Sequence, residues 1–340
     1  MWTAWRHLWR TKQGRDTAVS VVEWRDDGVL ALRADPHGAA GPEVLAACFI
    51  PCSPTARSHC ISQLKQKGWF RGPRNLLMLG TRQRQLTLLP HPTVPDAELA
   101  EAARWQLQDA LDYPPEEAVL DVLRLCEDEP PARQQIAVFS VRRSELDQLT
   151  APFGDHKIKL EGVDVADCAQ RNLTGLHAAH GRPLAMLSWR EDSILFSVSR
   201  ASEVLLSRSF DASKLGADAA DVSALAERVG LQLQRMLDAL ERRASTSSPA
   251  QILVLDHPGA PAALLNQTAE LTGLRVMPLE LAALMNSVAA ELPAELSADF
   301  LHLLGAALRP APLSKPTAAV VQAPRSALMP ASAMRAGVAA

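Results

Sequence analysis

The sequence predicts an α/β fold with two lobes, because the same order of elements occurs in both halves of the chain. In each half, three strands joined by short turns are followed by a helix, a strand and another helix. The length of 340 residues suffices for two domains or one large bilobed domain, and a hydrophobic content of 47% supplies sizeable cores. The halves share this order without a repeat in the sequence itself.

In the first half, the predicted strands are apolar runs bounded by turn residues. Asp26-Asp27-Gly28 separates the first two runs, which is a strong hairpin signal. Ser144 is placed to cap a later helix. We expect strands over 17–23, 29–33, 44–49, 75–79, 85–89, 135–141 and 158–162, and helices over 54–67, from 144 and over 165–178.

The stretch 95–125 predicts an amphipathic helix, an abrupt end and a strand. Asp96 is placed to cap this helix, and Glu98 lies in the first turn, where the helix dipole favours an anion. Pro114 and Pro115 end the helix, since neither donates a backbone N–H. An apolar stripe at helical spacing consists of Leu99, Ala103, Leu107, Ala110 and Leu111.

The second half begins with three strands and continues with a long amphipathic helix over 221–243. Its apolar face includes Leu225, Leu233 and Leu240. We expect the strands over 184–189, 194–199, 203–210, 252–255 and 274–277, and further helices from 260, over 279–288 and over 298–308.

Composition excludes several classes of function. A net charge of −3 argues against general nucleic-acid binding, and an odd number of five cysteines in a long chain indicates reduced thiols. No run reaches the roughly 18 apolar residues that a membrane-spanning helix needs. Charged residues interrupt the N-terminus by Arg6, so it lacks the apolar core of a signal peptide. We expect a chain that does not cross the membrane by itself.

Candidate metal and nucleophile sites are weak. Cys48, Cys52, His59 and Cys60 are close in sequence, but their spacing matches no common structural zinc pattern. Cys48 is expected on a strand and Cys60 in a helix, as small buried residues. The sequence has no Gly-x-Ser-x-Gly nucleophile elbow. We therefore expect neither a metal nor covalent catalysis, and the histidines expected at the surface or at helix ends are His156, His177, His180, His257 and His302.

The N-terminal segment 1–16 combines tryptophans with basic residues. On a helix the tryptophans share one face, since they fall at i, i+3 and i+7. The segment either packs these rings on the protein's own core or binds the interface of anionic lipid, where each basic residue gains roughly 1 kcal/mol. We favour the lipid surface, and the candidate membrane-surface residues are Trp2, Trp5, Arg6, Trp9 and Arg10.

The stretch 95–125 resembles a segment of the PilM/MshI group of pilus-assembly proteins: a helix with a tryptophan at its buried edge, an aromatic-proline pair, a glutamate, and a strand with an aspartate. Here the tryptophan is Trp105 and the aromatic-proline pair is Tyr113-Pro114. Similar short motifs follow in the same order over about 17–309, and the charged arm is similar to the MshI branch. These motifs are Glu161-Gly162-Val163-Asp164, Arg171-Asn172-Leu173, the three strands within 183–211, and 279–284.

The resemblance implies an actin-like bilobed fold with two ribonuclease-H-like lobes. It implies a basic arm over 1–16, a first lobe with an inserted subdomain over 17–180, a second lobe with a returning helix over 181–309, and a disordered Pro/Ala-rich tail over 310–340. It also implies a cytoplasmic scaffold, peripheral on the inner membrane, for a type IV (MSHA-like) pilus. Such a scaffold binds the cytoplasmic tail of a bitopic PilN-like partner and contacts the assembly ATPase indirectly.

The phosphate-binding turns of an actin-like ATPase are altered in this sequence. Such turns need glycine and small hydroxyl residues so that backbone N–H groups reach the phosphates, and an aspartate for Mg²⁺. The altered positions are Glu23 and Gly28 in the first turn, Ser188 and Glu191 in the second, and Gly259 at the adenosine-contacting position. We therefore expect no ATP hydrolysis and no bound cofactor.

Two alternatives remain open. One is an actin-like ATPase whose nucleotide cycle gates the pilus platform, against which the altered turns argue. The other is the cytoplasmic domain of a type II secretion protein of the GspL kind. A GspL-like protein normally continues into a transmembrane helix, whereas this sequence continues into the Pro/Ala-rich segment after Leu308.

Overall fold

The computed structural model describes residues 17–38, 41–127, 129–130, 133–177, 182–190, 193–201, 203–211, 222–243, 248–255, 262–279 and 294–310. Outside these residues lie the predicted arm over 1–16, residues 280–288 of the helix predicted over 279–288, and residues 311–340 of the tail predicted over 310–340. Leu279, the first residue of that predicted helix, is the last residue of a strand. One compact unit extends to Arg309.

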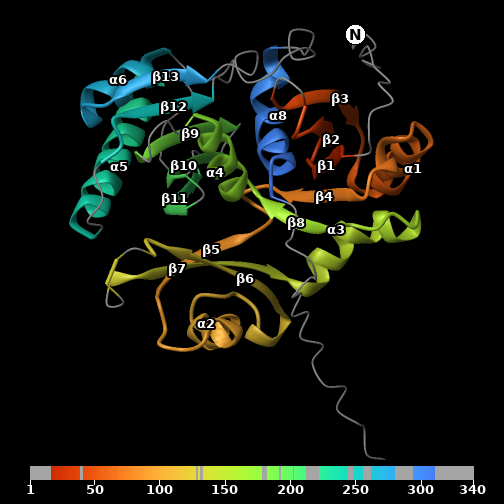
Figure 1. The fold of residues 1–340 in the computed structure, drawn as a ribbon, viewed down its shortest axis with the longest axis horizontal. Coiled ribbons are helices and arrows are strands. Elements are labelled where there is room, and N and C mark those ends of the chain that lie inside the picture. The colour runs from red at the N-terminus through yellow and green to blue at the C-terminus, as the bar shows by residue number, and fades with distance from the viewer. Residues whose placement is uncertain are drawn as a thin grey trace, which may run out of the picture. The chain divides into compact units, whose positions relative to one another are not determined.

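Two five-stranded sheets have the same topology (Figure 1). In the first, β1 (Val19–Trp24) pairs antiparallel with β2 (Gly28–Asp35), β2 pairs with β3 (Glu43–Pro51), and β1 pairs parallel with β4 (Arg74–Leu79), which pairs with β8 (Gly162–Val165). The second sheet repeats this order with β9 (Leu184–Arg190), β10 (Ser193–Arg200), β11 (Glu203–Asp211), β12 (Gln251–Leu255) and β13 (Arg275–Leu279). The predicted two-lobed α/β fold is therefore confirmed.

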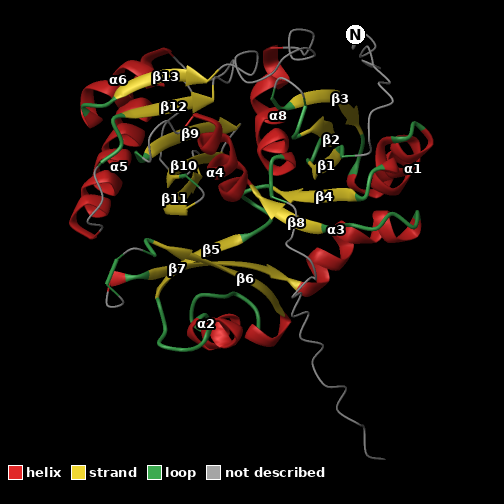
Figure 2. Ribbon diagram, in the orientation of Figure 1, coloured by secondary structure: helices red, strands yellow, loops and turns green. Residues whose placement is uncertain are grey.

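Helices α4 (Ala166–His177) and α8 (Ala294–Ala307) pack against each other and against strands of both sheets, as Figure 2 shows. On its other face the first sheet is covered by α1 (Arg57–Gln66) and α3 (Arg143–Asp155), and the second by α5 (Val222–Arg243), which contacts α6 (Ala262–Thr272). One apolar core thus joins the two lobes through α4 and α8, because buried residues of both sheets contact the same pair of helices.

A three-stranded antiparallel sheet is inserted between β4 and β8. Its strands β5 (Gln85–Pro90), β6 (Ala118–Leu125) and β7 (Gln135–Arg142) lie in the order β5-β7-β6. One face packs against the second lobe and the other against helix α2 (Leu99–Gln106), because alternate side chains of a strand point to opposite faces. Of the predicted helical stripe, Leu99, Ala103 and Leu107 are buried on this second face.

The predicted helix caps are wrong. Asp96 lies in a short 3₁₀ helix (Asp96–Glu98), and its carboxylate forms an ion pair with Arg124 on β6. Neither this turn nor α2 has a side-chain cap. Helix α3 begins at Arg143, one residue before the predicted cap Ser144, and also lacks a side-chain cap. The tryptophan that the family string places at a buried edge, Trp105, is 59% exposed, because the apolar stripe of α2 faces the sheet without it.

The strand predicted over 158–162 is shifted: β8 begins at Gly162. Ile158 is buried, but its N–H donates to Phe153 O at 2.9 Å, so it closes the end of α3 and does not pair in the sheet. Lys157, with φ of 54°, makes the left-handed turn that this helix end requires. The apolar run therefore packs beneath α3 before the chain enters the sheet.

Candidate functional site

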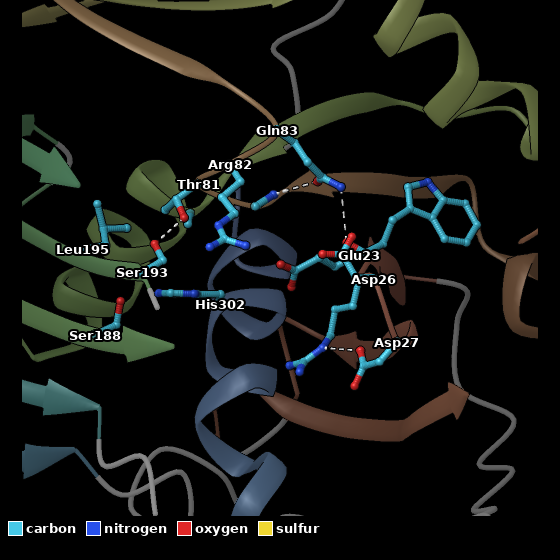
Figure 3. Close-up of a pocket in the computed structure, with 14 residues that line it drawn as sticks. Glu23, Asp26, Asp27, Thr81, Arg82, Gln83, Ser188, Ser193, Leu195 and His302 are labelled. Carbon is cyan, nitrogen blue, oxygen red and sulfur yellow. Dashed lines mark hydrogen bonds and ion pairs between the residues drawn. The ribbon is translucent and has the colours of Figure 1, made fainter. Parts of the chain in front are cut away.

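A cavity of about 230 Å³ lies between the two lobes and is lined from both (Figure 3). This volume is below the ~300–1,000 Å³ that is typical of sites for small molecules and cofactors. Its walls are the end of β1 and the β1–β2 turn, the connection after β4, β9, the starts of α4 and β10, and α8. The lining residues are Glu23, Trp24, Arg25, Asp26, Asp27, Gly80, Thr81, Arg82, Gln83, Ala166, Ser188, Ser193, Leu195 and His302.

The β1–β2 turn is a tight hairpin, as predicted. Arg25 N–H donates to Gly28 O at 2.8 Å, and the Arg25 guanidinium pairs with Asp27 at 2.9 Å. A Cβ atom on Gly28 would lie 2.5 Å from Ile50 O and 2.7 Å from the Phe49 ring. Glycine is therefore needed here so that β2 can approach β3 closely.

The connection after β4 holds the first turn and reaches the second lobe. Gly80 N–H donates to Gln83 Oε1 at 3.0 Å, and Gln83 Nε2 donates to Trp24 O at 3.3 Å. Thr81 and Ser193 form a short hydroxyl–hydroxyl hydrogen bond, so side chains of the two lobes meet at the cavity wall (Figure 3). Sequence reasoning missed these residues, although Gly80-Thr81 directly after a buried strand was an available signal.

A buried amide on α4 connects the second lobe and α8. Gln170 Nε2 donates to Ser188 Oγ at 2.7 Å, and Ser197 Oγ donates to Gln170 Oε1. His302 Nε2 lies 3.3 Å from Gln170 Nε2, and His302 is only 1% exposed. The expectation that His302 lies at the surface or at a helix end is therefore wrong, because α8 packs between the two sheets. The hydroxyl of Ser188 is engaged by the protein's own amide.

A buried ion pair connects the inserted sheet to the same helix. The Arg84 guanidinium pairs with the Asp167 carboxylate, and both side chains are 1% exposed. Ser207 on β11 donates to the same carboxylate, and Arg84 lies 5.6 Å from the centre of the Phe139 ring. Polar contacts from three parts of the fold thus converge on α4, and sequence reasoning did not identify them.

The remaining predicted site residues divide into two groups. Glu23, 2% exposed, and Ser188 line the cavity, and Gly28 lies at the start of β2. Outside the described residues lie Glu191, Gly259, Trp2, Trp5, Arg6, Trp9 and Arg10.

The cysteines occupy the expected elements, with Cys48 on β3 and Cys60 in α1. Burial raises the pKa of each thiol to about 12, so both are protonated at neutral pH. Within the described ranges, no group of three or more His, Cys, Asp or Glu side chains is arranged to hold a metal ion. In that same part of the chain, no helix combines the length and apolarity needed to cross a bilayer.

Comparison with protein families and with curated proteins finds no match. Solved structures do match. A chain of the PilM-PilN type IV pilus biogenesis complex superposes with a TM-score of 0.63 at 16% identity, covering 87% of this chain and 99% of that chain. A Bacteroides thetaiotaomicron protein with an actin-like ATPase fold and unknown function superposes with a TM-score of 0.50 at 11% identity, covering 85% of this chain and 96% of that chain. The cytoplasmic domain of EpsL, an inner-membrane component of the Vibrio cholerae type II secretion system, superposes with a TM-score of 0.48 at 13% identity, covering 86% of this chain and 96% of that chain.

Both the order of elements and the first two superpositions lead to the same fold. Each lobe has a five-stranded sheet with three antiparallel strands and two parallel ones, and a pair of helices lies between the sheets. The chain therefore has the bilobed actin-like ATPase fold.

Proposed function

We propose that this chain is a scaffold of a type IV pilus assembly platform, of the MSHA-like kind, that binds the cytoplasmic tail of a bitopic PilN-like inner-membrane protein. The observation that carries the proposal is the superposition on the PilM-PilN complex, which spans nearly all of that chain. The binding is of a peptide rather than a substrate: an extended tail is held by main-chain hydrogen bonds and a few apolar pockets. Contact with the assembly ATPase is indirect.

The scaffold neither hydrolyses ATP nor requires a nucleotide. Three features of the interlobe cavity support this: its small volume, the Thr81–Ser193 contact between the lobes, and the use of Gly28 for strand packing. The Gln170 amide supplies a polar contact between the lobes at Ser188. A nucleotide that bridged the lobes would compete with groups that are already hydrogen-bonded to each other. The rival hypothesis, an ATPase that gates the platform, requires these contacts to open.

The chain is peripheral on the cytoplasmic side of the inner membrane in this proposal, through the basic tryptophan-rich arm and the membrane partner together. The arm alone is a weak anchor, because stable attachment generally takes two membrane signals. Trp2, Trp5 and Trp9 would lie at the headgroup level, and Arg6 and Arg10 would face anionic lipid.

Co-expression with a candidate bitopic partner tests the proposal. We expect the full chain to co-purify with a partner that keeps its cytoplasmic tail and not with one from which the tail has been deleted. Equal recovery with and without the tail would contradict tail binding. Loss of the partner from the wild-type chain on adding ATP with Mg²⁺ would favour the nucleotide-gated rival.

A further inference from the structure

The outer side of helix α2 has no partner within the described part of the chain. Helix α2 covers the face of the inserted sheet that is turned away from the second lobe (Figure 1). Its apolar stripe, including Leu99 and Ala103, faces the sheet. Trp105 points elsewhere and is 59% exposed, and among the described residues only Leu176 is also a strongly exposed large hydrophobic side chain. An exposed tryptophan on an otherwise well-packed helix indicates a contact surface, since tryptophan is enriched at binding hot spots.

The segment of the inserted subdomain that carries α2 is strongly acidic. Residues 91–127 contain nine aspartates and glutamates, all exposed, and only two arginines. The net charge of this segment, nine negative and two positive side chains, is thus about twice as negative as the net charge of −3 of the whole chain. The remainder of the chain therefore has a positive balance, and the negative charge is concentrated on this subdomain.

Most of these carboxylates are not neutralised locally. In the described structure, ion pairs occupy Asp96, Glu101 and Glu117. Arg104, which pairs with Glu101 at 3.3 Å, also donates to the carbonyl oxygens of Pro115 and Ala118 at 2.6 and 2.8 Å. The Arg104 guanidinium is thus shared between Glu101 and backbone carbonyl groups before and at the start of β6. The outer side of α2 keeps a net negative charge.

Carboxylates flank Trp105 in the sequence at a spacing of four residues. Glu101 precedes it by about one turn of α2, the spacing that makes side chains neighbours on one helix face. Asp109 follows it in the turn after α2, which ends at Gln106. The backbone continues to coil in this turn, because Leu107 O accepts from Ala110 N–H and Leu111 N–H at 2.9 and 3.0 Å. A cation placed on the indole would meet carboxylates on both sides. Guanidinium and ammonium groups bind tryptophan faces in this way.

We propose that this surface docks a Lys/Arg-rich segment of the membrane partner's cytoplasmic tail. The α2 outer face is defined here as Glu98, Glu101, Trp105, Asp109 and Asp112. Charge complementarity selects the occupant: segments next to the cytoplasmic end of a transmembrane helix are enriched in Lys and Arg. The inference rests on the proposed function for the identity of the partner, but the surface itself is defined by burial and charge.

Binding of a fluorescein-labelled Arg/Lys-rich peptide to the full chain, followed by fluorescence anisotropy, tests the surface. We expect W105A to weaken binding roughly 5- to 30-fold, the loss expected for one cation–π contact. W105F should recover part of the affinity, because a smaller aromatic face remains. E101Q/D109N should weaken binding and reduce its dependence on salt.

Matched controls separate this surface from general electrostatic attraction. L176A removes the other exposed large hydrophobic side chain, and E145Q/D147N removes two exposed carboxylates from α3. Both variants should bind the basic peptide as the wild type does. If E145Q/D147N weakens binding as much as E101Q/D109N, or if W105A has no effect, the proposed surface is wrong. Concentration-dependent dimers that W105A abolishes would also overturn it, since the occupant would then be the basic arm of a second copy.

A second experiment distinguishes failure of this inference from failure of the proposed function. The membrane partner with its tail is co-purified with wild-type chain and with W105A. Equal recovery by both would leave the scaffold role intact and refute the docking surface. Trp105-dependent binding of the basic peptide without any recovery of a tailed partner would support the surface and refute the scaffold role.

Discussion

Replacing Arg84 by methionine perturbs the buried ion pair that joins the inserted sheet to helix α4. The side chains of Arg84 and Asp167 are each 1% exposed, and Ser207 donates to the same carboxylate. R84M keeps an apolar stem of similar length but leaves the Asp167 carboxylate buried without its cation. Breaking a buried pair in this way costs about 3–5 kcal/mol of unfolding free energy. We therefore expect a large loss of stability from this single substitution.

The double variant R84M/D167L removes both charges together. Apolar replacement of a whole buried pair is often nearly neutral, so this variant should recover most of the loss. R124M is the matched control: it breaks the ion pair with Asp96, whose side chains are 35% and 77% exposed, and should cost no more than about 1 kcal/mol. Urea unfolding followed by circular dichroism measures all four proteins.

Two results would show that the unpaired Asp167 charge does not set the stability of R84M. The first is a loss of less than about 1 kcal/mol for R84M, within the range of an exposed pair. The second is a double variant no more stable than R84M, which would mean that the single variant fails through lost packing on Phe139 rather than through an unpaired charge.

The remaining predictions concern pH and packing. Burial raises the pKa of Asp164 from 3.8 to about 6, so the folded state retains a proton that the unfolded chain loses. The free energy of unfolding should therefore fall as pH rises from about 4 to 6 and then level off. D164N should remove this fall: its free energy of unfolding should exceed that of the wild type by at most about 3 kcal/mol at pH 7 and should equal it below pH 4. Unfolding at several pH values measures both. G28A should cost about 1–3 kcal/mol by overpacking against Ile50 O at 2.5 Å, whereas G154A, where a Cβ meets nothing within 4 Å, should be neutral or slightly stabilising in thermal unfolding. A pH-independent stability difference for D164N, or equal melting temperatures for G28A and wild type, would contradict these two expectations.

Local signals predicted most of the strands and helices. The alternation of the first two strands and the Asp26-Asp27-Gly28 turn between them are properties of adjacent residues, so the hairpin could be predicted. The predicted strand over 158–162 was misplaced because Ile158 is buried beneath α3, and an apolar run does not reveal which surface covers it. Asp96 was assigned as a cap because its competitor, Arg124, is distant in sequence.

The candidate site could be predicted from the sequence only in part. The altered β1–β2 turn could be identified by its residue types. The side-chain contacts around α4 and the cavity could not be identified, because Arg84 and Asp167 are 83 positions apart, Thr81 and Ser193 are 112 apart, and Gln170 and His302 are 132 apart. Only the packing of α4 and α8 between the sheets brings these side chains together.

Isothermal titration calorimetry of the full chain with ATP and with ADP, in the presence of Mg²⁺, determines whether the interlobe cavity accepts a nucleotide. We expect no heat of binding up to high micromolar nucleotide, because the protein's own side chains connect the lobes at the cavity. Binding in the low micromolar range would contradict this expectation. The Thr81–Ser193 contact would then have to open, and the nucleotide-gated hypothesis would replace the scaffold without nucleotide.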